Sequence, residues 1–119
     1  MAFLILRTGL CLLALAIALG AFGAHGLESL VTEERLATWE TAVRYQAWLS
    51  LLLVGLGLSR LQISNWVFPL LLAGTVIFSG SLYLLVLLDL SILGAITPIG
   101  GVLMISGIVL AALSLKQLP

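Results

Sequence analysis

Long runs of hydrophobic residues make up most of the chain, and short polar stretches separate them. Four such runs cover residues 3–24, 42–59, 66–88 and 98–115. A helix needs about 20 mostly apolar residues to cross the hydrocarbon core of a bilayer, and each run is close to that length. The pattern therefore predicts one domain over residues 1–119, an all-α integral membrane protein built as an antiparallel four-helix bundle with short loops.

The second run differs from the others because a charged segment leads into it without a break. Residues 32–59 begin as TEERLATWETAVRYQ and carry half of the formal charges of the chain. We expect one long helix whose amphipathic start, residues 32–41, lies at the membrane surface and whose second half lies in the bilayer. The other three helices are expected to pack around it.

The faces of this helix follow from a turn of about 100° per residue. One face holds Trp39, Gln46, Ser50 and Gly57. Another face, which we assign to lipid, holds Tyr45, Leu49, Leu52 and Leu56. Three aromatic residues, Trp39, Tyr45 and Trp48, fall where an interfacial aromatic belt is expected.

Residues at the ends of the runs predict where the helices begin and end. Thr32, Asn65 and the pair Thr97–Pro98 are typical of helix starts. Gly26 is a natural stop for the first helix, and Asp89 closes the third.

Composition agrees with a membrane protein. Hydrophobic residues make up 62% of the chain and charged residues 8%, against roughly 25% charged in soluble domains. The net charge is zero, so no electrostatic field favours nucleic acid as a partner. The first apolar run is longer than the core of a secretion signal, about 7–15 residues, and we interpret it as a membrane span. The single Cys11 excludes an intrachain disulfide.

Four spans would place both termini on one side of the membrane. That side carries Arg7, Arg60 and Lys116, whereas the other carries Arg35 and Arg44 together with all five acidic residues. Because Lys and Arg are enriched in cytoplasmic loops, we expect both termini in the cytoplasm. The membrane is then a bacterial-type inner or plasma membrane, with a mitochondrial membrane as the alternative.

Candidate chemistry is sparse. The single His25 is either a proton carrier or metal or haem ligand, or an interfacial histidine bonded to backbone or headgroups. Arg44 lies inside the predicted span, with Glu40 one turn away and Asp89 within reach from the same side. The pair either belongs to a ligand site or only orients the second helix.

Other polar residues of the spans complete a hypothetical ligand site. The proposed members are His25, Glu40, Arg44, Tyr45, Gln46, Ser79, Ser81, Tyr83 and Asp89. The alternative is that the buried ones make hydrogen bonds between helices. No nucleophile with a base and a helper acid is visible, and we expect no enzymatic activity, no metal and no cofactor.

Several sequence motifs resemble a known family. GAFGAHGLE at 20–28, TWETAVRYQ at 38–46, FSGSLYLL at 78–85 and ITPIGG at 96–101 are similar to the small membrane family known as domain of unknown function 423. That family includes bacterial YgdD-type proteins and mitochondrial transmembrane-protein-256-like proteins. The resemblance implies a four-helix membrane protein and supplies no known reaction. Family members often have a histidine where this chain has Leu49, so a role that needs two histidines does not transfer.

The expected function is that of a structural, accessory or assembly subunit in the membrane, as a homo-oligomer or within a larger complex. The alternative is a binder or carrier of a small molecule or lipid at the polar end of the bundle.

Overall fold

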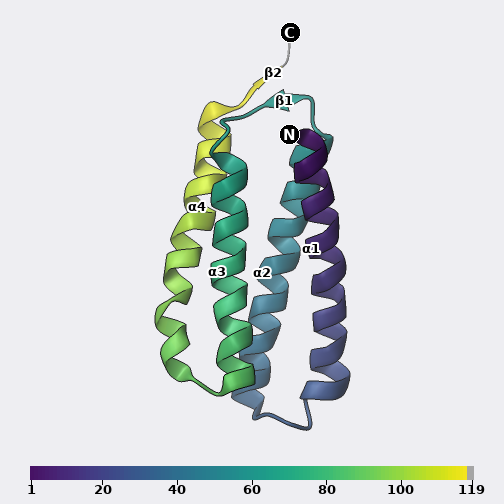
Figure 1. Ribbon diagram of the computed structural model, residues 1–119, viewed down its shortest axis with the longest axis vertical. Helices are drawn as coiled ribbons and strands as arrows, with labels where there is room; N and C mark the ends of the chain where they lie inside the picture. The colour runs from purple at the N-terminus through teal and green to yellow at the C-terminus, as the bar shows by residue number, and fades with distance from the viewer. Residues whose placement is uncertain (118–119) are drawn as a thin grey trace.

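The computed structural model describes residues 1–117 and consists of four long antiparallel helices joined by short connections (Figure 1). All four helices are long and apolar enough to cross a membrane, as predicted. The elements are α1 (Ala2–Phe22), which continues as a π-helical turn η1 (Gly23–Leu27), α2 (Glu33–Leu58), β1 (Leu61–Gln62), α3 (Val67–Leu88), the 3-10 turn η2 (Ser91–Ala95), α4 (Thr97–Ser114) and β2 (Lys116–Gln117).

The helices lie side by side in sequence order and form a flattened layer (Figure 1). The molecule measures 54 × 26 × 16 Å along its principal axes. α1 packs against α2, α2 against α3, and α3 against α4, so α1 and α4 lie at opposite edges. The expectation that three helices surround the second is therefore wrong for α4, which packs on α3. As a result α3 is the most enclosed helix, with 39% of its spanning segment buried against 17% for α1 and for α4.

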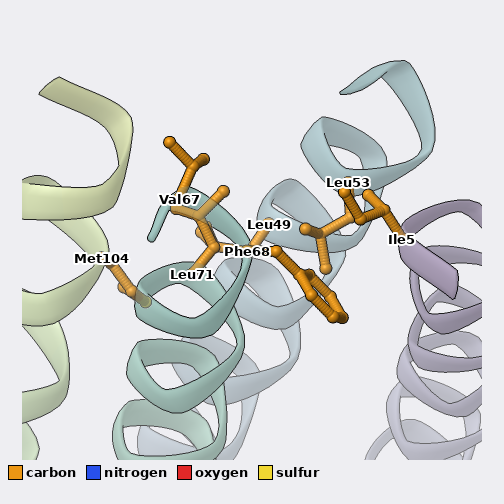
Figure 2. Packing of buried hydrophobic residues seen from close by; sticks show 7 residues of the cluster. All are labelled: Ile5, Leu49, Leu53, Val67, Phe68, Leu71 and Met104. Atoms are coloured by element: carbon orange, nitrogen blue, oxygen red, sulfur yellow. The ribbon is translucent and has the colours of Figure 1, made fainter. Parts of the chain in front are cut away.

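Two hydrophobic clusters form the core, one towards each end of the layer. The cluster in Figure 2 draws on all four helices and consists of Ile5, Leu49, Leu53, Val67, Phe68, Leu71 and Met104. The second consists of Leu27, Trp39, Ala42, Leu82, Leu85 and Val86. Leu49 is only 5% exposed, so its assignment to a lipid face is wrong. Tyr45, Leu52 and Leu56 are partly buried against the first cluster, for the same reason: α2 has neighbours on both sides.

Glycines set the close approach of the paired helices. A Cβ added to Gly57 would lie 2.7 Å from the backbone of Leu6, and one added to Gly74 would lie 2.7 Å from the backbone nitrogen of Met104. Small residues let membrane helices approach until their backbones touch, which maximises packing where burial from water contributes little. The α1–α2 and α3–α4 contacts are built in this way.

Two predicted helix ends are confirmed. The Thr32 hydroxyl accepts a hydrogen bond from the backbone N–H of Arg35 (3.2 Å), which is an N-cap. Asp89 ends α3 in the left-handed conformation, with φ of 54°.

Three other predicted ends differ in whole or in part. The residue flanking α3 is Trp66 and not Asn65, and its N–H is bonded to the Ser64 hydroxyl (3.3 Å). α4 begins at Thr97 with Pro98 in its first turn, as predicted, but the Thr97 hydroxyl bonds Ser81 of α3 instead of capping its own helix. The first helix passes Gly26 because the π-helical turn continues it to Leu27.

Both termini lie at the same end of the layer (Figure 1). There β1 pairs with β2 in antiparallel register, Leu61 opposite Gln117 and Gln62 opposite Lys116. This short ladder, which the sequence did not predict, ties the α2–α3 connection to the segment after α4.

Candidate functional site

The residues predicted to form a ligand site do not converge on one place. Gln46, Ser79, Ser81 and Tyr83 lie within the layer, where their hydroxyl and amide groups connect helices. His25, Glu40 and Arg44 are exposed on its outer surface. Asp89 lies at the end opposite the termini, and Tyr45 is half-buried beside Phe78.

Gln46 is the centre of the interior hydrogen bonds because it joins three helices. Its amide nitrogen donates to the backbone carbonyl of Leu12 in α1 (2.8 Å), and its amide oxygen accepts from the Tyr83 hydroxyl of α3 (2.7 Å). About two turns earlier on the same face, the indole N–H of Trp39 donates to the Leu19 carbonyl (2.9 Å). Both bonds satisfy a donor that would otherwise lie in an apolar interior, and both fix α1 against α2.

Serine hydroxyls make the remaining links between helices. Ser79 of α3 donates to the Ala42 carbonyl of α2 (2.7 Å), and the hydroxyls of Ser81 and Thr97 share a hydrogen bond (2.6 Å) that joins α3 to α4. Within residues 1–117 no buried side-chain nitrogen or oxygen lacks a hydrogen-bond partner. The interior polar groups are therefore engaged with one another, as in the second of the two interpretations of these residues.

Aromatic rings surround the Gln46 bonds. The Trp39 ring lies 4.7 Å from that of Tyr83 and 5.7 Å from that of Phe22, centroid to centroid. Trp39 is 2% exposed, so it belongs to the core and not to an interfacial belt. Trp48 is exposed, and Trp66 is 71% exposed at the start of α3, where a belt residue is expected.

Arg35 and Asp89 join the two central helices at the end opposite the termini. The Nη2 atom of Arg35 lies 3.0 Å from a carboxylate oxygen of Asp89 and also donates to the Ser91 hydroxyl (2.9 Å), while Nε donates to the same carboxylate oxygen (3.1 Å). The prediction that Asp89 reaches Arg44 is wrong. The end of α3 lies beside the start of α2, so Asp89 meets Arg35 in the first turn of α2 and not Arg44 further along. Arg35 was not among the predicted site residues. The sequence feature that could have identified it is a pair of opposite charges, one at the start of the second helix and one at the end of the third, which face each other in an antiparallel pair.

A hollow of about 600 Å³ opens beside this ion pair. Its walls come from the connection after η1, the start of α2 and the end of α3: Leu27, Ser29, Leu30, Val31, Thr32, Arg35, Val86, Leu87 and Asp89. Of the predicted site residues, Asp89 alone lines this hollow. The hollow combines an apolar wall with the Arg35–Asp89 ion pair, an arrangement suited to an amphipathic ligand whose head can bond the guanidinium beside Asp89.

Glu40 and Arg44 lie outside the layer near its mid-height. Ser79, which bonds the Ala42 carbonyl, is twelve residues after Val67 and nine before Leu88, the ends of α3. Arg44 is thus about 15–17 Å from either end of α3, at a rise of 1.5 Å per residue, and Glu40 is about 11 Å from the Leu88 end. Both side chains are exposed there.

The predicted Glu40–Arg44 ion pair is not present. In the described part of the chain, the ion pair of Arg35 with Asp89 is the sole one. An arginine left unpaired at the centre of a bilayer costs about 2.5–3.5 kcal/mol. This pair of charges is therefore the strongest polar feature that the single chain leaves without a partner.

His25 lies in the π-helical turn and is exposed at the end opposite the termini. Among residues 1–117 there is no group of three His, Cys, Asp or Glu side chains close enough to hold a metal ion. The position of His25 fits the interfacial interpretation, and a role as a proton carrier stays a prediction.

Comparison with known proteins adds relatives but no reaction. Residues 19–101 match the family model described as "Protein of unknown function (DUF423)". A "UPF0382 membrane protein" of Staphylococcus epidermidis is 50% identical over 107 residues, which cover 86% of this chain and 87% of that protein. The UPF0382 membrane protein YwdK of Bacillus subtilis is 43% identical over 113 residues, 87% of this chain and 89% of that protein. No solved structure matches the chain significantly.

Proposed function

The chain belongs to the DUF423 family of small bacterial membrane proteins, and from this premise we propose that it is a non-enzymatic structural or assembly subunit of a membrane complex. The observation that carries the proposal is the division of its polar groups. The buried ones all have hydrogen-bond partners within the described residues, several of them across helices, whereas Glu40 and Arg44 face outwards. Polar groups within a bilayer are expensive unless protein surrounds them, so a neighbouring protein is the natural cover for them.

The shape of the molecule supports this role. The layer is flat, and α1 and α4 are each packed along one side only. A flat layer offers broad surfaces to neighbouring proteins.

Affinity purification in a mild detergent tests the proposal. A tag after the last residue should recover the protein in a stable complex larger than one chain plus its detergent micelle, measured by native mass spectrometry. Arg44→Leu should reduce recovery of that complex while Lys116→Leu, a charge removed at the membrane surface, should not. A wild-type protein that is monomeric and free of protein partners in detergent and in nanodiscs would refute a subunit role.

A second candidate function, a binder of a lipid or other amphipathic anion, is favoured by the hollow beside Arg35. Its apolar wall of Leu27, Leu30 and Val86 suits an acyl chain, and the guanidinium suits a headgroup phosphate. Native mass spectrometry should then find a bound anionic lipid that Arg35→Gln removes. If native mass spectrometry found zwitterionic lipid bound as well as anionic lipid, this candidate function would be contradicted.

For the location, we propose a bacterial inner or plasma membrane with both termini in the cytoplasm. The relatives are bacterial membrane proteins. The end that carries the termini also carries Arg7, Arg60 and Lys116, and positive residues favour the cytoplasmic side.

A further inference from the structure

The outward face of α2 is a continuous stripe directly opposite its buried face. The exposed residues of this face are Glu33, Ala37, Glu40, Arg44, Trp48, Leu51, Gly55 and Leu58, spaced three or four apart along the whole helix. Residues at this spacing form one face of a helix and are the positions through which two membrane helices pack at a shallow angle. The stripe is mixed: charged in its first half, and apolar or small in its second.

Gly55 is a small residue on this stripe, and packing within the chain does not require it, as it does not require Gly80 on α3. A Cβ added to Gly55 would meet no atom of the chain within 4 Å, whereas one added to Gly57, two residues later, would touch the backbone of Leu6. Glycine weakens a helix relative to alanine. Packing inside the chain accounts for Gly57 and does not account for Gly55. A close neighbour outside the chain would account for a glycine at this position.

The charges on the stripe identify which neighbour fits. Glu40 and Arg44 are one helical turn apart, opposite in sign, and exposed where the surrounding surface of α1 is apolar, as at Ile17 (67% exposed). A two-fold axis along the membrane normal places the same stripe of a second copy against the first. Each copy then offers an acid and a base one turn apart, and the acid of one can meet the base of the other in both directions.

We propose that the outward face of α2 is the interface of a parallel homodimer, in which Glu40 of each copy pairs with Arg44 of the other and Gly55 allows the C-terminal halves of the helices to approach closely. This inference rests on the proposed function and names its partner as a second copy of the chain. A lipid headgroup would neutralise Arg44 and leave Glu40 repelled, and an apolar partner helix would leave both charges uncovered. A second copy covers both.

Two single charge reversals test the pairing between copies. Glu40→Arg gives a chain with two positive charges on the stripe, and Arg44→Glu gives one with two negative charges. Each variant alone should dimerise at least about thirtyfold more weakly than wild type, which corresponds to 2 kcal/mol at about 1.4 kcal/mol per tenfold. Co-expressed with different affinity tags, the two variants should form mixed dimers at near wild-type yield, since each supplies the charge that the other lacks.

The mixed pair separates this proposal from an ion pair inside one chain. If Glu40 and Arg44 only bonded each other within a helix, neither reversal would be rescued by the other in a separate molecule. The proposal is overturned if mixed dimers are no more abundant than the dimers of either variant, or if wild type is monomeric in nanodiscs. Far-ultraviolet circular dichroism and elution volume of each variant confirm that it is folded, which is expected because both side chains are exposed in the single chain.

Cysteine crosslinking tests whether the two-fold axis of the dimer lies beside α2. In a chain whose Cys11 is replaced by alanine, Leu51→Cys should form a disulfide-linked dimer on mild oxidation in native membranes. Ile105→Cys, equally an exposed apolar position (64% against 55% exposed) but on α4, should not. Crosslinking at Ile105 and not at Leu51 would overturn the proposal even if the wild type is dimeric. A partner of another kind recovered with a monomeric chain would support the subunit role and overturn the dimer.

Discussion

Replacing Gly74 with alanine should push α3 and α4 slightly apart and lower the stability of the protein, whereas the same replacement at Gly80 of α3 should not. The Cβ added to Gly74 would lie 2.7 Å from the backbone nitrogen of Met104 and 2.9 Å from the backbone oxygen of Gly100. Non-bonded carbon atoms are most stable at about 3.5–4.0 Å, so the facing backbone must move back by about 0.5–1 Å. At Gly80 the added Cβ meets nothing within 4 Å.

The size of the effect follows from two opposing terms. Overpacking a close helix contact costs about 1–3 kcal/mol, and a gap of 0.5–1 Å forfeits a quarter to a half of the attraction across it. Alanine is favoured over glycine in a helix by about 1 kcal/mol. We therefore expect Gly74→Ala to lower the free energy of unfolding by about 1 kcal/mol and Gly80→Ala to raise it by up to about 1 kcal/mol. The contrast between the two is about 2 kcal/mol.

Reversible unfolding in mixed micelles of a mild detergent and dodecyl sulfate, followed by circular dichroism, measures both variants under the same conditions. The comparison is matched because both substitutions add one methyl group to α3. If Gly74→Ala is as stable as Gly80→Ala, the α3–α4 contact is not the close backbone approach described above, and the account of the fold at that pair is refuted.

The remaining predictions concern the interior bonds, the end of α3 and the topology. Tyr83→Phe removes the hydrogen bond to the Gln46 amide and should lower the free energy of unfolding by about 0.6 kcal/mol, and by no more than about 1.7, in the same assay. Asp89→Gly should be about 1 kcal/mol more stable than Asp89→Ala, since both lose the ion pair but only glycine accepts a φ of 54° without strain; equal stabilities would contradict this. In a chain without its native cysteine, an impermeant maleimide added to intact cells should label Ser29→Cys and reach Arg60→Cys only after permeabilisation, and the opposite result would invert the proposed orientation.

The helices were predictable from the sequence because each is a long apolar run ended by polar residues. The starts at Thr32 and after Trp66 and the end at Asp89 all lie within a residue or two of the sequence-based boundaries. Length and hydropathy decide this level of structure, since a backbone in lipid must satisfy its hydrogen bonds within a helix. The π-helical turn through Gly26 was not predictable, because a glycine signals a stop and a continuation equally well.

The arrangement of side chains around the helices was harder to predict. The face of α2 with Trp39 and Gln46 is indeed distinct, but the neighbouring face with Leu49 was assigned to lipid and is buried. In water an apolar face is the inward one. In a bilayer both inward and outward faces are apolar, so hydrophobicity alone does not distinguish them.

Polar residues within the spans are more informative than apolar ones, because a polar side chain in a bilayer needs a partner. The sequence suggested which of them bond another helix, but it did not show which face of the helix points inwards. Ser79 and Ser81 were recognised as possible helix–helix bonds, and both make them. Arg44 was paired with Glu40 because i,i+4 spacing on one helix favours it. The sequence could not show that their shared face points away from the other helices, since that depends on how α1 and α3 flank α2.

The two faces of α2 make opposite demands on the membrane. Its inner face is complete, because Gln46 and Trp39 find their partners on α1 and α3 within the same chain. Its outer face exposes Glu40 and Arg44 seven and eleven residues into α2, and lipid tails at that level would stabilise neither charge. A single chain can hold this arrangement in a detergent micelle, where water reaches the charges. In a bilayer the same charges raise the free energy of the monomer and so favour any association that pairs them. Association is thus a consequence of where α1 and α3 leave α2 uncovered, and it should strengthen as the detergent is replaced by lipid.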